Sequence, residues 1–321
     1  MAFLFISTVE SIKAWAPPLH AAIPGLDLRH WQNDAPDGGD GVGDTAEIDY
    51  IITAIPPEGV ISRQRFPNIK AIFGMWAGVD SLLKDPTFPR DIPYMRLVDG
   101  GLKSGMAEYM TAWTLYFHRG FHVLADQQRR HEWREILPAP DTAGRRVGIL
   151  GLGELGQAAA HMLGDVGFRN IAGWSRTEKA VPGVQSFFGQ DQLAAFLNRS
   201  EILIALLPLT PETDGILNAE KLSALPQGAV VINAGRGRHV VAADLLKALD
   251  SGHLAGAVLD VCEPEPLPAD SPFWDHPKVI ITPHTSSMSV PDIAAHEIAA
   301  NLKRIAAGEM PSGLVDWSLG Y

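Results

Sequence analysis

The sequence predicts an α/β protein made of two doubly wound domains, each built on a parallel sheet. Short apolar runs recur along the chain and alternate with turn residues and helical patterns, which is typical of strand-helix alternation. A glycine-rich turn joins one of these runs to a helical pattern of small residues. With 321 residues, 46% of them hydrophobic and 20% charged, the chain is long enough for two buried cores.

Residues 1–98 predict a small α/β domain. Several of its apolar runs are near-continuous, which is the pattern of strands buried on both faces. The strand candidates are residues 3–7, 27–31, 49–55, 69–75 and 94–98. Turns are predicted where Pro and Gly cluster, at Pro17-Pro18, Asp37-Gly38-Gly39 and Pro56-Pro57-Glu58-Gly59.

The next segment predicts a long helix followed by an exposed arm. The pair Gly100-Gly101 follows Asp99 and precedes a helical pattern over residues 105–117, so it fits either a hinge between domains or an ordinary loop. Residues 118–133 are polar and basic, as on a solvated face. Because the helix is too apolar for a surface helix and the arm follows it directly, we expect a homodimer that pairs through this region.

A glycine turn lies at the centre of the second half. Gly151-x-Gly153-x-x-Gly156 lies between an apolar run and a helical pattern, and a second strand pattern follows at residues 170–174. Gly151 permits the tight turn, Gly153 lets the backbone approach phosphates, and Gly156 lets the helix pack close to the strand. Chance alone would give roughly 0.3 such patterns in this chain, so the β-α-β context is what predicts a dinucleotide bound at the helix N-terminus.

The alternation continues to residue 283 and makes the second domain Rossmann-like. Strands are predicted at 201–208, 228–235, 255–261 and 279–283, with helices at 219–225 and 242–251. A last amphipathic helix is predicted over residues 291–308. Because the first domain has little helix of its own, we expect this last helix to cross back onto it.

Polar residues follow three successive strands of the second domain. Arg236, Glu265 and His284 each come just after a strand, and ligands of open α/β sheets bind beyond the carboxyl ends of the strands. Such a set can bind a carboxylate, hold an imidazole and move a proton. Taken singly, the three also fit an ion pair on a helix, a carboxylate in a Pro-rich loop and a cap at a strand end. Together they indicate a catalytic site.

At these motifs the sequence resembles the D-isomer-specific 2-hydroxyacid dehydrogenase family over nearly the whole chain. The matching motifs are the glycine turn, Leu206-Leu207-Pro208-Leu209-Thr210-Pro211-Glu212-Thr213, Asn233-Ala234-Gly235-Arg236-Gly237, residues 260–268 and Thr282-Pro283-His284. Within that family it is similar to the glyoxylate/hydroxypyruvate reductase A group. That similarity lies in Trp174-Ser175-Arg176, Ala248-Leu249-Asp250-Ser251-Gly252, Ser271-Pro272-x-Trp274-x-His276-Pro277 and Gly320-Tyr321.

The resemblance implies a role for each member of the catalytic set. Arg236 would grip a 2-oxo acid and polarise its carbonyl, while His284 would protonate the carbonyl oxygen during hydride transfer. Glu265 would hydrogen-bond the imidazole and favour its protonated form. The implied domains are a flavodoxin-like substrate domain at residues 1–99, completed by 287–321, and a dinucleotide-binding Rossmann domain at 100–286.

Substrate contacts are also implied in the first domain. Relatives bind the substrate carboxylate with backbone N–H groups of a loop that here carries Trp76, Ala77 and Gly78. Most relatives have a small residue at Trp76, and the related reductases have a Trp near Ala54 instead. Trp76 therefore either supplies an apolar wall that Ala54 does not, or packs without touching a ligand.

Residues after the second strand of the glycine-turn unit indicate which cofactor is used. Ser175, Arg176 and Thr177 lack the carboxylate that binds an NAD ribose, and with Lys179 they offer hydroxyls and cations to a 2′-phosphate. We therefore expect NADPH to be preferred. NADH remains possible, because the Glu178 carboxylate disfavours a phosphate and Arg176 also fits an ordinary surface position. The expected cofactor contacts are Gly151, Gly153, Glu154, Leu155, Gly156, Ser175, Arg176, Thr177, Lys179, Leu207, Pro208, Thr213, Ala234, Gly235 and Asp260.

The composition of the chain limits which partners it can bind and which cellular compartment it suits. The net charge of −11 argues against a nucleic-acid or anionic-membrane surface, and no apolar run reaches membrane-spanning length. A single cysteine, Cys262, suits a reducing compartment, so we expect a cytoplasmic protein without disulfides. We interpret Cys262 as a small buried hydrophobe rather than a nucleophile. No His, Cys, Asp and Glu cluster has metal-ligand spacing, so we expect no metal.

The function expected from these features is NADPH-dependent reduction of a small 2-oxo acid, glyoxylate or hydroxypyruvate, to the 2-hydroxy acid. One alternative is a dehydrogenase of a bulkier acid of the phenylpyruvate or 2-ketogluconate type. Another is a non-catalytic protein that senses a dinucleotide. Retention of the full set Arg236, Glu265 and His284 favours catalysis over sensing.

Overall fold

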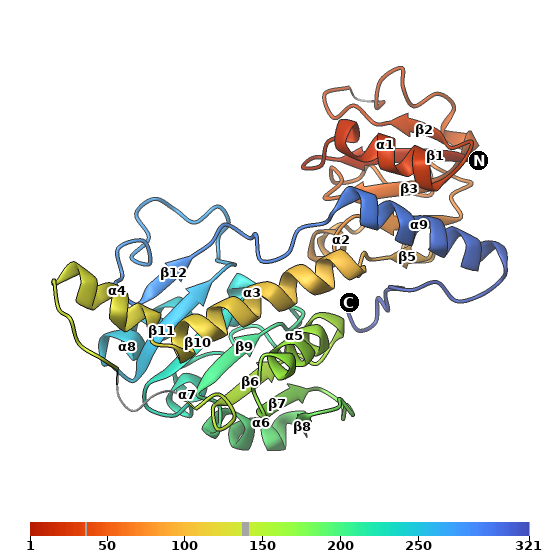
Figure 1. Ribbon diagram of the computed structural model, residues 1–321. Helices are drawn as coiled ribbons and strands as arrows, with labels where there is room; N and C mark the ends of the chain where they lie inside the picture. The colour runs from red at the N-terminus through yellow and green to blue at the C-terminus, as the bar shows by residue number, and fades with distance from the viewer. Residues whose placement is uncertain (36, 137–140, 321) are drawn as a thin grey trace. The chain divides into compact units, whose positions relative to one another are not determined.

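The computed structural model describes residues 1–35, 37–136 and 141–320, and the chain divides into two compact units (Figure 1). Unit 1 comprises Met1–Leu102 and Ser289–Tyr321, and unit 2 comprises Lys103–Met288. The boundaries expected from the sequence, after residues 99 and 286, lie within three residues of these. Each unit contains a parallel sheet with flanking helices, which confirms the predicted fold class.

Unit 1 is built on a five-stranded parallel sheet in the order β2-β1-β3-β4-β5. That order is the flavodoxin-like one, in which the chain reverses direction beside the first strand. The strands are β1 (Ala2–Ser7), β2 (Asp27–His30), β3 (Ile48–Ala54), β4 (Ala71–Gly74) and β5 (Tyr94–Met95). All of β1 is buried, as expected for a strand covered on both faces.

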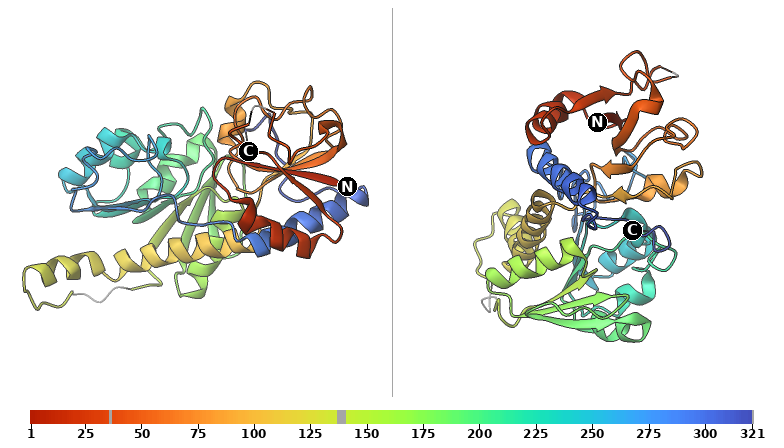
Figure 2. Two further views of the ribbon diagram at one scale, coloured as in Figure 1. Left: turned by 90° about the horizontal axis from the view of Figure 1, so that it is seen from above. Right: turned by 90° about the vertical axis from the view of Figure 1, so that its right-hand side faces the viewer.

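The helices of unit 1 come from both ends of the chain. They are α1 (Ile12–Ala22), η1 (Thr45–Glu47), α2 (Asp80–Lys84) and α9 (Pro291–Ala306). In both figures α9 runs alongside α1, although more than 250 residues separate them in sequence (Figures 1 and 2). The C-terminal helix therefore completes the N-terminal unit.

The turn predicted at Pro17-Pro18 is wrong, because both prolines lie inside α1. Each proline removes the backbone hydrogen bond to the residue four positions earlier, and these residues, Lys13 and Ala14, lie on the exposed side of the helix. Trp15 and Leu19 on the opposite side are fully buried. Burial of these two side chains therefore outweighs the low helix propensity of proline.

The Gly-Gly pair is not a loop that precedes the long helix. Helix α3 (Gly100–His118) begins at Gly100, five residues earlier than the sequence indicated. A carboxylate oxygen of Asp99 accepts the backbone N–H of Leu102 at 2.8 Å, which is the hydrogen bond of an N-terminal cap. The capping bond compensates for the poor helix propensity of two glycines.

Unit 2 is built on a seven-stranded parallel sheet in the order β12-β11-β10-β9-β6-β7-β8. Its strands are β6 (Arg146–Leu150), β7 (Asn170–Ser175), β8 (Val184–Phe188), β9 (Ile202–Ala205), β10 (Ala229–Asn233), β11 (Leu254–Leu259) and β12 (Val279–Ile281). Strand β8 and the helix after it were not predicted. Because β8 is an edge strand with no fully buried residue, it lacks the apolar run that marked the other strands.

Helices cover both faces of the second sheet. Those of this unit are α3, α4 (Phe121–Arg129), α5 (Glu154–Asp165), α6 (Gly189–Asn198), α7 (Ala219–Ser223), η2 (Gly237–His239) and α8 (Ala242–Asp250). Side chains of α3 and α5 pack in one hydrophobic core against the sheet. Side chains of α6, α7 and α8 pack in a second core. This two-faced covering makes the unit doubly wound.

The glycine turn depends on two close backbone approaches. Gly151 has a φ of +102°, which L side chains rarely adopt, and a β-carbon there would lie 2.6 Å from the carbonyl oxygen of Leu206. A β-carbon on Gly156 would lie 1.8 Å from the carbonyl oxygen of Gly151. Helix α5 therefore rests directly on the turn, as the sequence predicted for the third glycine.

These contacts predict opposite effects for two substitutions in the same helix. Gly156→Ala should destabilise the protein by about 1–3 kcal/mol, because the methyl group collides with the Gly151 carbonyl. Gly164→Ala is the matched control, since a β-carbon there meets no heavy atom within 4 Å, and helix propensity should stabilise it by roughly 0.5–1 kcal/mol. Urea unfolding of both variants measures the difference. Equal stabilities would contradict the close contact.

Candidate active site

Six strands of unit 2 end at one edge of the sheet, and the predicted site residues follow them. Because all strand pairs are parallel, their carboxyl ends share this edge. The residues there are Gly151 after β6, Ser175 at the end of β7, Leu207 after β9, Arg236 after β10, Asp260 after β11 and His284 after β12. The edge thus gathers the predicted catalytic set and the predicted dinucleotide turn.

His284 and Glu265 form a hydrogen-bonded pair. Imidazole Nδ1 of His284 lies 2.9 Å from one carboxylate oxygen of Glu265. The other oxygen accepts the backbone N–H of Cys262 at 2.9 Å, which fixes the carboxylate. Since Nδ1 is committed to Glu265, Nε2 is the ring nitrogen available for proton exchange. Both side chains are about half exposed, so a ligand can reach the ring.

Asp260 holds the backbone that carries His284. Its carboxylate is almost fully buried and accepts the Thr282 hydroxyl at 2.6 Å and two further backbone N–H groups. The backbone N–H of His284 donates to the Asp260 carbonyl at 2.8 Å. His284 has a φ of +55°, an uncommon conformation for a residue other than glycine. The described contacts of Asp260 therefore fix the strained turn, a role that the sequence did not indicate.

The Arg236 backbone is held on both sides. The amide of Asn233 donates to the Arg236 carbonyl at 2.9 Å, and the Arg236 N–H donates to Nδ1 of His239 at 3.1 Å. A β-carbon on Gly237 would lie 2.1 Å from backbone atoms of Cys262, so this loop touches the segment that leads to Glu265. His239 is not among the site residues expected from the sequence, although its position three residues after Arg236 is a local signal for this contact.

The glycine turn fits a dinucleotide pyrophosphate. A β-carbon on Gly153 would meet no protein atom within 4 Å, so space remains where the backbone would approach a phosphate. The first helical residue, Glu154, pairs with Lys103 at 2.6 Å. Leu155 packs against the core shared by α3 and α5. The turn therefore offers the N-terminus of α5 to an anion, with one cation close by.

Residues at the end of β7 make up the expected ribose site. Ser175 is buried, and its hydroxyl donates to the carbonyl of Thr177 at 2.7 Å. Arg176 and Lys179 are exposed. The Thr210 hydroxyl and, more weakly, the charge of Arg176 lower the pKa of the Glu212 carboxyl. Arg176 thus lies close enough to the loop after β9 to interact with it electrostatically.

The loop after β9 is stabilised from within. The Thr213 hydroxyl donates to the Pro208 carbonyl at 2.7 Å and accepts the Thr210 N–H at 2.8 Å. Thr213 and Leu207 are buried. The adjacent residues after β10, Ala234 and Gly235, are buried as well. These four predicted cofactor contacts are therefore buried in the loops that follow β9 and β10.

In unit 1, Trp76 is anchored through its indole N–H. That group donates to one carboxylate oxygen of Glu10 at 2.8 Å, and the other oxygen accepts the indole N–H of Trp15 at 2.9 Å. Trp76 and Ala54 line the same small cavity of about 20 Å³. Ala77 and Gly78 are half-buried. The Trp76 side chain therefore lies close to Ala54, the position near which the related reductases are expected to carry a tryptophan.

The Cys262 thiol is poorly suited to nucleophilic chemistry. Burial, with the charges of Glu265 and Asp260, raises its pKa to about 11. Over residues 1–35, 37–136 and 141–320, no group of three or more His, Cys, Asp or Glu side chains could hold a metal ion. In the same described ranges, no helix is both long and apolar enough to span a membrane.

The fold and the site define an α/β protein that combines a dinucleotide-type glycine turn with an Arg, Glu and His set. Residues 111–286 match the family described as D-isomer specific 2-hydroxyacid dehydrogenase, NAD binding domain. A glyoxylate/hydroxypyruvate reductase A of Serratia proteamaculans is 40% identical, with all of both chains covered. The chain belongs to the D-isomer specific 2-hydroxyacid dehydrogenase family, which confirms the resemblance seen in the motifs.

Solved structures agree over the whole chain. A D-isomer specific 2-hydroxyacid dehydrogenase of Xanthobacter autotrophicus, solved with NADPH and MES, is 44% identical with a TM-score of 0.92. An NADPH-dependent glyoxylate/hydroxypyruvate reductase of Sinorhizobium meliloti, solved with NADP and sulfate, is 35% identical with a TM-score of 0.89. Each comparison covers 100% of this chain and 99% of the other. Of the motifs that suggested the reductase group, the final Tyr321 lies outside the described residues.

The raised pKa of Cys262 predicts slow alkylation. At pH 8 a thiol with a pKa of about 11 is about 0.1% ionised, whereas a free cysteine with a pKa of ~8.5 is about one quarter ionised. Iodoacetamide should therefore modify the native protein roughly 200-fold more slowly than the urea-unfolded chain. Because Cys262 is the single cysteine, mass spectrometry reads the reaction directly. Equal rates would contradict the assignment of a protonated thiol.

Proposed function

We propose that this protein reduces a small 2-oxo acid, glyoxylate or hydroxypyruvate, to the 2-hydroxy acid with NADPH. The observation that carries the proposal is the hydrogen-bonded His284 and Glu265 pair on the same sheet edge as Arg236 and the glycine turn. The reductase names of the relatives support the substrate class. The chemistry of the three side chains supports reduction over simple binding.

A bound nicotinamide dinucleotide would supply the hydride, held by the turn from Gly151 to Gly156. Arg236 binds the substrate carboxylate and polarises the ketone with its guanidinium. His284 donates the Nε2 proton to the carbonyl oxygen as the negative charge develops there. Glu265 orients the ring through Nδ1 and stabilises its charged form before the transfer.

The substrate-binding role of unit 1 is part of the proposal. Backbone N–H groups of Trp76, Ala77 and Gly78 bind the substrate carboxylate. The indole N–H of Trp76 is already bonded to Glu10, so the ring offers only apolar surface to a ligand. An apolar wall beside Ala54 favours a compact substituent on the 2-oxo acid.

The acid and base assignment predicts both rate and pH dependence. His284→Ala should lower turnover by about 100-fold or more, the usual contribution of a general acid. Wild-type turnover should fall as pH rises, because the reaction uses the protonated ring. Glu265→Gln should also lower turnover, since it removes the carboxylate that orients the ring. Absorbance at 340 nm with glyoxylate, hydroxypyruvate, phenylpyruvate and 2-ketogluconate measures these rates.

His276 provides the control for this experiment. Its Nε2 lies 3.3 Å from the Asp250 carboxylate, so it is also a histidine beside a carboxylate. However, His276 precedes β12, whereas His284 follows the carboxyl end of that strand. His276→Ala should therefore retain turnover. Near-normal turnover of His284→Ala would refute the assignment, and activity confined to the two bulkier acids would replace the proposed substrate class. Binding of NADPH without reduction of any acid would favour the sensing alternative.

The cofactor preference follows from the charges at the end of β7. Arg176 and Lys179 are cations, Ser175 and Thr177 bring hydroxyl groups, and none of the four carries a carboxylate. A 2′-phosphate is therefore attracted where an NAD-specific site would repel it. The NADPH and NADP in two solved relatives support this proposal.

Replacement of these groups should reverse the preference. Ser175→Asp combined with Arg176→Ala should lower kcat/KM for NADPH by roughly 10- to 100-fold, as expected for the loss of charge-assisted hydrogen bonds of roughly 1.5–3 kcal/mol. The same change should raise kcat/KM for NADH. Arg169→Ala, one residue before β7 and at the opposite end of the strand from Ser175, is the control and should leave the ratio unchanged. A wild-type enzyme that uses NADH equally well at the same salt concentration would contradict the proposal.

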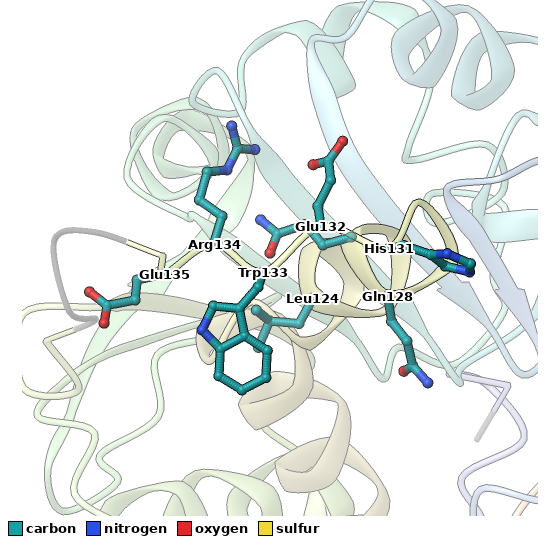
Figure 3. A pocket seen from close by; sticks show the side chains of 8 residues that line it. Leu124, Gln128, His131, Glu132, Trp133, Arg134 and Glu135 are labelled. Carbon is teal, nitrogen blue, oxygen red and sulfur yellow. The ribbon is translucent and has the colours of Figure 1, made fainter.

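The arm after α3 supports a homodimer. Its apolar side chains Phe121, Val123, Leu124 and Trp133 are exposed, so a solvated charged face describes only part of the arm. A hollow of about 620 Å³ runs along α4 and the segment after it (Figure 3). Figure 3 shows Trp133 on the same side of the arm as Leu124, with Arg134 on the other side. A second copy of the chain would bury these apolar groups.

The dimer proposal predicts a change of mass on substitution. The wild-type protein, with a chain of 34.7 kDa, should sediment at micromolar concentration as a particle of twice that mass. Leu124→Asp combined with Trp133→Asp should give a monomer, because two charges cannot be buried in an apolar interface. Met310→Asp changes an exposed apolar residue of unit 1 and should remain dimeric. A wild-type monomer would refute the proposal.

We also propose a cytoplasmic location and no nucleic-acid or membrane partner. The single cysteine supports a reducing compartment. The net charge of −11 opposes binding to polyanions.

A further inference from the structure

His239 is a fully buried histidine that joins two loops of the sheet edge. It ends η2, and its Nδ1 accepts the backbone N–H of Arg236 at 3.1 Å. Because an N–H group can only donate, Nδ1 carries no proton, and the proton of the neutral ring lies on Nε2. That Nε2 lies 3.2 Å from the carbonyl oxygen of Pro208, which can only accept. The two partners therefore fix one tautomer of the ring.

The contact with Arg236 leaves its peptide little freedom. Asn233 binds the Arg236 carbonyl from the other side at 2.9 Å. A β-carbon on Gly235 would lie 2.9 Å from the His239 ring, so the ring packs directly against this backbone. A shift of the Arg236 peptide would break a hydrogen bond on either side.

The contact with Pro208 extends the connection into the loop after β9. The Pro208 carbonyl also accepts the Thr213 hydroxyl at 2.7 Å. A continuous chain of hydrogen bonds thus runs from Thr213 through Pro208 and the His239 ring to the Arg236 N–H. Its two ends lie in the loop that we assign to the cofactor and in the loop that carries the substrate arginine.

We propose that His239 is a positioning residue that sets Arg236 relative to the cofactor loop. This rests on the proposed function, which gives Arg236 to the substrate and Pro208 to the dinucleotide. A neutral imidazole donates from one rigid edge and accepts at another, so it can hold both loops at a fixed spacing. Substrate affinity then depends on one nitrogen of the ring, and cofactor affinity depends on the other.

Two amide substitutions separate the nitrogens. In His239→Asn the side-chain oxygen can take the place of Nδ1 and accept from Arg236, but it cannot reach Pro208. In His239→Gln the side-chain nitrogen can take the place of Nε2 and donate to Pro208, but the bond to Arg236 is lost. His239→Leu removes both bonds at similar volume. The readouts are the Kd of NADPH from its fluorescence and the Kd of oxalate for the NADP complex from calorimetry.

The proposal predicts a crossover between the two amides. His239→Leu should weaken oxalate and NADPH by about 10-fold each. His239→Asn should recover most of the oxalate affinity and remain weak for NADPH, while His239→Gln should do the reverse. With hydroxypyruvate, His239→Gln should raise KM more than it lowers kcat. Unchanged affinities in His239→Leu, or any pattern without the crossover, overturn the proposal.

A matched histidine controls for general loss of stability. His253 precedes β11, and its ring contacts the Leu222 carbonyl at 3.1 Å and the Gln227 side chain at 3.3 Å. His253→Leu should leave both affinities unchanged, and a loss equal to that of His239→Leu would show that the effect is not local. If the wild-type protein reduces neither glyoxylate nor hydroxypyruvate yet shows the crossover, the proposed function fails while the role of His239 stands.

Discussion

The buried carboxylate of Asp260 is the interaction on which the catalytic edge depends. Asp260 follows the strand between β10 and β12, and its backbone N–H donates to the carbonyl of Asn233 at the end of β10. Its side chain and carbonyl hold residues 282–286 after β12. One residue thus joins three strand ends, and removal of its carboxylate would leave buried N–H groups without partners.

Around that centre, the position of each reactive group is set by a polar neighbour. Glu265 orients the His284 ring, Cys262 orients Glu265 through its backbone, and Asn233 holds Arg236. The bonds of Cys262 and Asn233 act within one loop each, and the bond between Glu265 and His284 joins the loops that follow β11 and β12. Such preorganisation lets the charges developing on a substrate meet groups that are already oriented.

In unit 1 a polar neighbour also fixes an aromatic side chain, that of Trp76. The Glu10 carboxylate accepts both the buried Trp15 indole and the Trp76 indole, so the position of Trp76 is tied to helix α1. This bond fixes a large aromatic residue within the loop of residues 74–80. It also makes Glu10 a residue through which substitutions in α1 can affect the position of Trp76.

The sequence alone determined the fold class of both units, and it supplied the proposal that Arg236, Glu265 and His284 form the catalytic set. Strand-length apolar runs, the three glycines and the order of the motifs are local patterns, because burial of both sheet faces and close backbone approaches constrain residue type directly. What failed were features with weak or contrary local signals, namely helix α1 across Pro17-Pro18, the helix start at Gly100 and the exposed edge strand β8.

The tertiary structure decided which polar groups support the chemistry. Neither the bond of Asp260 to Thr282 nor that of His239 to Pro208 could be predicted, since these partners follow different strands and lie 22 and 31 residues apart in sequence. The same holds for Glu10 and Trp76, which are separated by 66 residues and share one hydrogen bond. Residue type states what a side chain can donate or accept, and only the fold brings that side chain to its partner.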